Sequence, residues 1–136
     1  MFEISLVPVI VATVVTMLIG MAWYSQKMFG AIWAREAGVN PGASDGSENM
    51  GKQVLSGAIQ NFVIIYILAH FLLLAEAYPG ADALIGAAWM AILVAATHVG
   101  SVIWERKSLT YFAINAGHLT VTIIVSALIL TRWPWA

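Results

Sequence analysis

Four polar side chains in otherwise apolar stretches of this 136-residue chain are of types that can do chemistry. His98 and His118 carry imidazoles, which exchange protons near neutral pH and bind metals or haem through neutral nitrogens. Asn61 and Asn115 carry amides, which donate and accept hydrogen bonds. Counted at ~1.5 Å per helical residue from one end of each stretch, the four lie about 9 to 13 Å deep. We therefore expect them to share one layer of a helical bundle.

Two interpretations of this layer remain open. In the first, the side chains only hold helices together, because polar groups hydrogen-bond across membrane helices at roughly 0.6 to 2 kcal/mol each. In the second, they line a polar pocket. No metal or haem site is predicted, because H-E-x-x-H is absent, no carboxylate lies mid-stretch and the two imidazoles match in depth only within about 5 Å. His70, near the opposite end of its stretch, is interpreted as an interfacial hydrogen-bonding residue.

The last apolar stretch also carries a polar stripe along one helical face, at i, i+3 and i+4 spacing. Its members are Ser108, Tyr111, Asn115, His118, Thr122 and Ser126. A shorter stripe on the preceding stretch consists of His98, Ser101 and Glu105. Because Glu105 is followed by Arg106 and Lys107, a solvated turn with a weak local ion pair is its plainer interpretation. Both stripes are expected to face each other or a partner subunit rather than lipid.

The composition is that of a membrane protein. Hydrophobic residues make up 61% and charged residues 10%, against about 25% charged in soluble domains. A net charge of −1 without a basic run argues against nucleic acid as a partner. The absence of cysteine excludes disulfides, thiolate catalysis and iron–sulfur clusters. With no catalytic triad, phosphate loop or nucleophile elbow, we predict neither catalytic residues nor a cofactor, and no enzyme.

Four apolar segments are predicted to be membrane-spanning helices of one transmembrane domain, residues 1–136. The spans are residues 4–23, 54–75, 83–104 and 109–130. At ~1.5 Å per residue, 22 residues cover roughly 33 Å, enough for a hydrocarbon core of about 30 Å. The predicted fold class is therefore all-α, a polytopic four-helix bundle. The first segment lacks a preceding basic region and is expected to be retained rather than cleaved.

Lysine and arginine predict the orientation in the membrane. Five of the six lie at the ends that meet loop 27–53 and the loop before the last span: Lys27, Arg35, Lys52, Arg106 and Lys107. Because cytoplasmic loops carry the excess of positive charge, loop 27–53 is expected in the cytoplasm and both termini outside. Aromatic residues are expected to form belts at both boundaries. Those belts would hold Trp23, Tyr24, Trp33, Trp104 and Tyr111 on the inner side, and Tyr78, Trp133 and Trp135 on the outer side.

The stretch WYSQKMFG, residues 23–30, is predicted to turn the chain from the first span into a short interfacial helix. Met28, Phe29, Ile32 and Trp33 form one apolar stripe, which favours a helix lying flat on the membrane and ending at Gly38. The following residues 39–51 are rich in turn formers and are predicted to form a surface loop.

Small residues recur at a spacing of four on several predicted spans, which permits close approach of helices. They include Ala12, Thr16 and Gly20, Ala87, Ala91 and Ala95, Ala96 with Gly100, and Ala113 with Gly117. There are more such faces than four short helices need. We therefore predict a homo-oligomer.

Two motifs resemble the DUF1761 family of small bacterial membrane proteins. Its W-Y-S-P, F-G and W pattern is matched by Trp23, Tyr24, Ser25, Phe29, Gly30 and Trp33, with Gln26 in place of the proline. Its E-R and I-N-A-G pattern is matched by Glu105, Arg106, Ile114, Asn115, Ala116 and Gly117. The resemblance spans nearly the whole chain and implies a four-helix protein of the bacterial cytoplasmic membrane. It implies no activity, because the family is named for its unknown function.

The candidate site is a polar pocket facing the cytoplasm, or a subunit interface. It comprises Trp23, Tyr24, Ser25, Asn61, His98, Glu105, Asn115 and His118. Two function classes remain open. The chain is either a homo-oligomeric scaffold that binds a lipid or small ligand, or a small oligomeric transporter with a path along the polar stripe of the fourth span. Against transport, no inverted repeat, broken helix or buried acid is evident.

Overall fold

The computed structural model describes residues 4–39, 50–76 and 81–133. These residues form five helices and no strand. The helices are α1 (Leu6–Trp23), α2 (Gly30–Ala37), α3 (Met50–Leu74), α4 (Ala81–Ile103) and α5 (Leu109–Arg132). All but α2 are long and apolar enough to cross a membrane. The predicted all-α fold with four spans is confirmed, and α3 begins four residues before the expected start at residue 54.

Parts of the sequence interpretation lie outside the described residues. They are most of the predicted surface loop, residues 40–49, and two aromatic residues of the outer belt, Tyr78 and Trp135.

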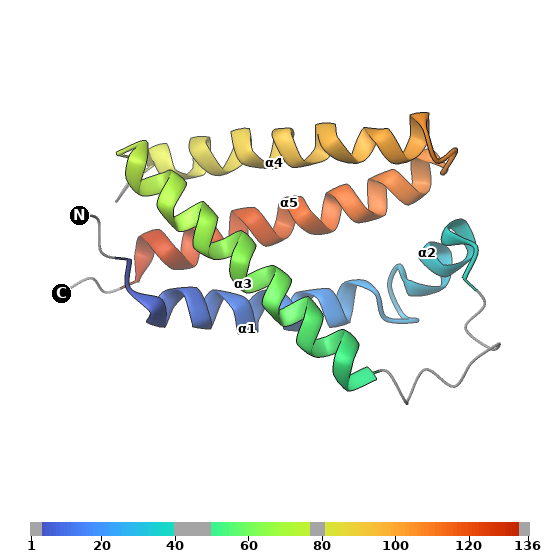
Figure 1. Cartoon of the computed structure of the whole chain (residues 1–136), viewed down its shortest axis with the longest axis horizontal. Helices are drawn as coiled ribbons and strands as arrows, with labels where there is room; N and C mark the ends of the chain where they lie inside the picture. Colours follow the sequence, from blue (N-terminus) through green and yellow to red (C-terminus); the bar gives the residue numbers. More distant parts are fainter. Residues whose placement is uncertain (1–3, 40–49, 77–80, 134–136) are drawn as a thin grey trace.

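The long helices form a bundle in which α3 runs obliquely (Figure 1). α4 packs along α5, and α1 packs on both α5 and α3. The start of α1 and the end of α5 lie at one end of the bundle, and α2 lies at the other (Figure 1). α3 approaches α4 where the two are joined and then diverges from it, so their mutual contact is sparse. We call the α2 end the basic end; it carries Lys27, Arg35, Lys52, Arg106 and Lys107.

The hydrophobic core fills the half of the bundle away from α2. Its larger members include Val9, Ile65, Leu68, Leu72, Ile123 and Leu130. Small residues on α1 and α4 let the helices approach closely, because van der Waals packing rather than water exclusion drives helix association in lipid. Ala12, Thr16, Ala87 and Ala91 are buried inside the single chain. These small faces therefore serve contacts within the bundle.

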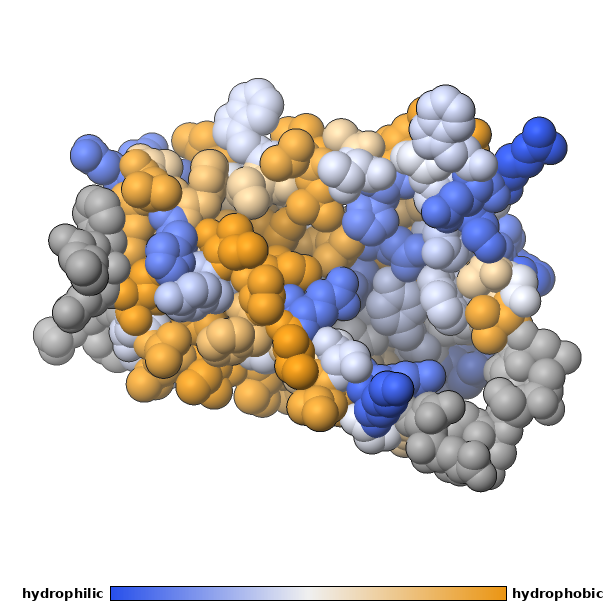
Figure 2. Space-filling view, in the orientation of Figure 1, coloured by the Kyte–Doolittle hydropathy of each residue, from blue (hydrophilic) through white to orange (hydrophobic). Residues whose placement is uncertain are grey.

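The outward faces of α1, α3 and α4 are apolar. Exposed side chains there include Val14, Leu18, Leu55, Ile59, Val63, Ile85, Trp89 and Leu93. Figure 2 shows this surface in orange over the core half, with blue residues gathered toward the basic end. A water-soluble monomer rarely exposes so large an apolar surface, whereas a helix bundle surrounded by lipid requires it.

The stretch from Trp23 to Gly30 forms a compact turn. The Trp23 carbonyl accepts the Phe29 N–H at 3.0 Å, and the Ser25 carbonyl accepts the Gly30 N–H at 2.9 Å. A Cβ at Gly30 would collide with the Tyr24 carbonyl oxygen and lie 2.8 Å from that of Ser25. Both obstacles are backbone atoms, which cannot rotate away. Only glycine fits this position.

The short helix α2 follows this turn and packs on α5. Its predicted apolar stripe divides in the structure. The rings of Phe29 and Trp33 lie against the end of α1 and the residue after it, 4.8 Å from Trp23 and 5.6 Å from Tyr24 between centroids. Met28 and Ile32 stay exposed. The aromatic half of the stripe therefore fixes α2 to the bundle, and the aliphatic half faces outward.

Replacing Gly30 by alanine is expected to destabilise the fold by about 1 to 3 kcal/mol, because the added methyl overpacks against backbone. Gly51→Ala is the matched control. Nothing lies within 4 Å of a Cβ at Gly51, so the helical preference for alanine should leave stability unchanged or slightly higher. Denaturant titration in detergent micelles, followed by circular dichroism, measures both. Equal stability of the two variants would contradict this account of the turn.

Candidate functional site

Helices α1 and α5 hold each other through two aromatic side chains and two glycines. The Trp23 indole N–H donates to the Ile114 carbonyl at 3.1 Å. A Cβ at Gly117 would lie 3.2 Å from the Trp23 ring, and one at Gly20 would lie 3.1 Å from His118 Nε2. Each ring therefore occupies the room that a glycine leaves on the opposite helix.

Tyr24, directly after α1, extends this contact. Its hydroxyl donates to Asn115 Oδ1 at 2.7 Å, and its ring lies edge-on to His118 with centroids 5.1 Å apart. Burial, and secondarily the neighbouring Tyr111, raises the pKa of Tyr24 to about 12. The hydroxyl therefore stays protonated across the physiological range and can act as a donor. With its oxygen bonded to Tyr24, the Asn115 amide keeps its two N–H groups for another partner.

Asn61 links α3 to α1. Its Nδ2 donates to Thr16 Oγ1 at 3.1 Å, and the Thr16 hydroxyl donates to the Ala12 carbonyl at 2.8 Å. Both side chains are buried. This bond fits the helix-joining interpretation of the polar layer.

The polar layer also encloses a cavity of about 240 Å³, which we call the deep cavity. Its lining comes from α3, α4 and α5 and from Tyr24, the residue after α1. The lining residues are Tyr24, Gln60, Asn61, His98, Asn115, His118 and Leu119. The surface in Figure 2 is hollowed at this level, between α3 and α4 and over α5. The deep cavity therefore lies where α3 diverges from α4.

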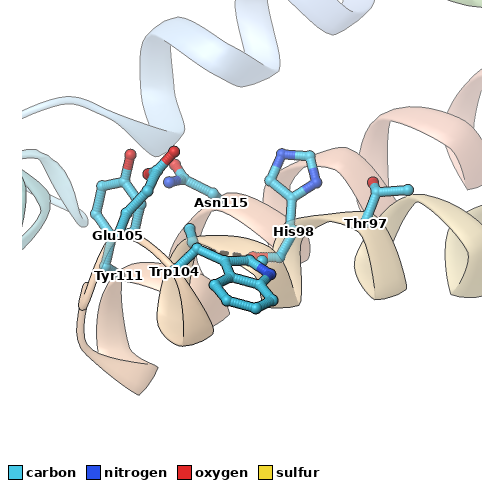
Figure 3. Close-up of a pocket in the computed structure, with 8 residues that line it drawn as sticks. Thr97, His98, Trp104, Glu105, Tyr111 and Asn115 are labelled. Carbon is cyan, nitrogen blue, oxygen red and sulfur yellow. Dashed lines mark hydrogen bonds between the residues drawn. The ribbon is translucent and has the colours of Figure 1, made fainter.

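A second cavity, of about 420 Å³, adjoins the deep cavity on the side of the basic end. We call it the mouth. It is lined by Thr97, His98, Gly100, Ser101, Trp104, Glu105, Tyr111 and Asn115. His98 and Asn115 line both cavities, so the two form one polar cleft. In Figure 3 the side chains of His98, Glu105, Tyr111 and Asn115 point to the same side of the α4–α5 pair.

Six of the eight predicted site residues line this cleft. Tyr24, Asn61, His98, Asn115 and His118 lie in the deep cavity, and Glu105 lies in the mouth. Trp23 and Ser25 line neither cavity. Trp23 packs on α5, as described above, while the Ser25 hydroxyl donates to the Ala22 carbonyl at 2.7 Å. The backbone carbonyls of both residues accept hydrogen bonds in the turn that follows Tyr24.

Sequence reasoning missed Gln60, which lines the deep cavity. It precedes Asn61 on a helix that is otherwise apolar here, and this was the available signal. Its side chain is exposed, and it makes no hydrogen bond with the described residues. Its amide is therefore available to a ligand.

The two imidazoles of the cleft have different partners. His98 Nδ1 bonds to the Val94 carbonyl at 2.9 Å, which leaves Nε2 as the ring nitrogen available to a ligand. His118 Nε2 is buried and has no hydrogen-bond partner among the described residues. Within the same residues, no group of three His, Cys, Asp or Glu side chains could hold a metal ion.

The turn after α4 sets the position of Glu105. Arg106 has a φ of 56°, and the Lys107 N–H donates to the Ser101 carbonyl at 2.9 Å, which folds the chain back on the last turn of α4. Lys107 Nζ donates to the Ala37 carbonyl at 3.1 Å. The local ion pair expected for Glu105 is not seen among the described residues. Its carboxylate therefore faces the mouth without a cationic partner.

The fold and the cleft define a multi-pass helical membrane protein with a polar cleft between its spans. The chain belongs to the DUF1761 family, described as proteins of unknown function, whose family model matches residues 7–131. Neither the curated proteins nor the solved structures that were compared include a significant match to the chain.

Replacing Tyr24 by phenylalanine should lower stability by about 1 kcal/mol, because it leaves a partly buried Asn115 oxygen without its donor. Tyr66→Phe is the control, since the exposed Tyr66 hydroxyl makes no hydrogen bond with the described residues. A double-mutant cycle of Tyr24→Phe with Asn115→Leu, measured by denaturant titration, should give a coupling of roughly 0.6 to 2 kcal/mol. Additive effects would show that the bond contributes nothing.

Proposed function

We propose that this protein binds the polar head of a membrane lipid in the cleft between α3 and α4. One observation carries the proposal: a polar cavity opens sideways between two helices whose outer faces are apolar. A fully polar ligand needs a route from water, whereas an amphipathic molecule can enter such a cleft from the bilayer itself. Its acyl chains would remain among exposed side chains such as Ile59 and Leu93.

The chemistry of the lining supports this assignment. Polar groups at membrane depth are costly unless they find partners. Gln60 has no hydrogen bond with the described residues. The Asn115 N–H groups and His98 Nε2 also have no partner among them and are left for a ligand in the cleft. The amide N–H groups of Gln60 and Asn115 would donate to phosphate or ester oxygens. His98 Nε2 would instead accept a hydrogen bond from the headgroup, because the Val94 carbonyl holds the ring proton on Nδ1. A cleft used only to join helices would bring such groups onto one another, as it does for Asn61 and Thr16.

We also propose that the protein assembles with copies of itself. Ala96 is exposed and Gly100 is only partly covered, and no atom except one of Trp104 lies within 4 Å of a Cβ at Gly100. This pair of small residues at a spacing of four leaves an open face on α4 beside the mouth, which Gly100 also lines, and it is of the kind that joins membrane helices.

Ala96→Leu is expected to shift the protein from its assembled form toward the monomer, because the larger side chain keeps helices apart. Ala22→Leu, at another exposed alanine, should leave the subunit count unchanged. Native mass spectrometry from nanodiscs measures the count. A wild-type protein that is monomeric at every concentration would refute the assembly.

Transport is the alternative function. The polar stripe of α5 continues from the cleft to Thr122 and Ser126, whose buried hydroxyls have no partner among the described residues. These positions lie beside the packed core, next to Ile123 and Ala127. A flux assay in liposomes separates the alternatives, because a lipid binder gives no flux of water-soluble solutes.

The binding proposal is tested with two histidine variants. His98 and His70 each bond through Nδ1 to a carbonyl one turn earlier, both at 2.9 Å, so replacement by leucine removes the same internal bond from each. Only His98 lines the cleft. We expect His98→Leu to retain about tenfold less lipid in native mass spectra, equivalent to about 1.4 kcal/mol, and His70→Leu to resemble wild type. Equal retention in all three proteins, or no reproducible lipid adduct, would overturn the proposal.

A further inference from the structure

The cleft has an uneven distribution of charge. Among the described residues, Glu105 is the one charged side chain that lines the mouth, and no charged side chain lines the deep cavity. The deep cavity instead offers uncharged hydrogen-bonding groups from Gln60, Asn115 and His98. A negative group thus lies toward the basic end, with neutral groups deeper in the bundle.

From this arrangement we infer that the cleft selects a zwitterionic phospholipid whose headgroup ends in a primary ammonium. This inference rests on the proposed lipid-binding function and names its ligand. The ammonium would lie in the mouth on Glu105, and the phosphate and ester oxygens would lie against the donors of the deep cavity. Glu105 lies after the end of α4, more than one helical turn beyond His98, so the two ends of the cleft can hold different parts of one headgroup.

The mouth has the groups that recognise an ammonium. The Glu105 carboxylate has no ion-pair partner among the described residues, and it lines the mouth together with Tyr111 and Asn115 (Figure 3). A carboxylate forms short, charge-assisted hydrogen bonds with N–H donors. Trp104 and Tyr111 add aromatic rings, which attract cations over their faces. Lys107 Nζ lies 5.5 Å from the centroid of the Tyr111 ring and donates to the Ala37 carbonyl. It forms no ion pair with Glu105.

The α3 side of the cleft carries the opposite charge. A neighbouring hollow of about 490 Å³ is lined by Lys52, Gln53, Ser56, Gly57 and Gln60. Gln60 also lines the deep cavity, so this hollow continues the cleft along α3. Lys52 on one side and Glu105 on the other match a headgroup that carries both signs. They do not match a headgroup with a phosphate alone, because Glu105 would repel it.

The direction of the charges fits a lipid in its ordinary orientation. In a bilayer the ammonium of such a headgroup lies toward water and the glycerol esters lie toward the hydrocarbon. The cleft has the same order, from Glu105 after the end of α4 to the donors of the polar layer. Phosphatidylcholine has a similar order but no N–H to donate, so the carboxylate distinguishes the two.

The experiment uses nanodiscs with equal amounts of phosphatidylethanolamine, phosphatidylglycerol and phosphatidylcholine, and reads the retained lipid by native mass spectrometry. We expect wild-type protein to be enriched about tenfold in phosphatidylethanolamine over both other lipids. Glu105→Gln should abolish the preference while lipid is still retained. Glu36→Gln should keep the preference, because Glu36 lies on α2 and pairs with Arg35 at 3.9 Å.

The outcomes separate the two proposals. Retained lipid without a preference for phosphatidylethanolamine, or a preference unchanged in Glu105→Gln, overturns this inference and leaves lipid binding standing. Equal retention of phosphatidylcholine also overturns it, since aromatic rings alone would then account for the binding. The absence of any retained lipid overturns both.

Discussion

The close contact of α1 with α5 is the constraint on which the rest of the structure depends. Trp23 lies over Gly117 and His118 lies against Gly20, so the two helices can approach only because each offers a glycine to the other's ring. This contact fixes the end of α1, and with it the hydroxyl of Tyr24 on Asn115. The turn that ends at Gly30 then places α2 against α5. The contact between α1 and α5 thus positions Tyr24, Asn115 and His118, which line one side of the cleft.

The cleft exists because α3 is joined to the bundle differently from the other spans. It is bonded to α1 through Asn61 and Thr16 and packs into the core through Ile65, Leu68 and Leu72. It has few contacts with α4, from which it diverges toward the basic end. Side chains that face α4 in that half therefore meet open space rather than another helix. The same divergence leaves polar groups of the cleft without partners among the described residues and keeps the cleft open between α3 and α4.

Hydropathy and helical periodicity predicted the spans and the depth of the polar layer, because both follow from local sequence. The rotation of each helix about its own axis does not follow from local sequence. On α3, Gln53, Ser56 and Gln60 follow i, i+3 and i+7 spacing, but this spacing does not tell whether that face meets the cleft or the lipid. The positions of Trp23 and Ser25 depend on a turn closed by Gly30. The direction of the Glu105 side chain depends on the left-handed backbone conformation of Arg106. Such backbone details arise from packing between distant segments.

The hydrogen bonds of Trp23 and Tyr24 to α5 each join residues 91 positions apart. During synthesis these two hydrogen bonds therefore cannot form until α5 has been made. Contacts at such long separation form late and slow folding. Until then α1 can pair with α3 through Thr16 and Asn61, which are 45 positions apart. A growing chain that contains only α1 and α3 can thus form this helix pair but lacks the α4 and α5 residues that line the cleft. Insertion of the α4–α5 hairpin then completes the lining of the cleft in one late step.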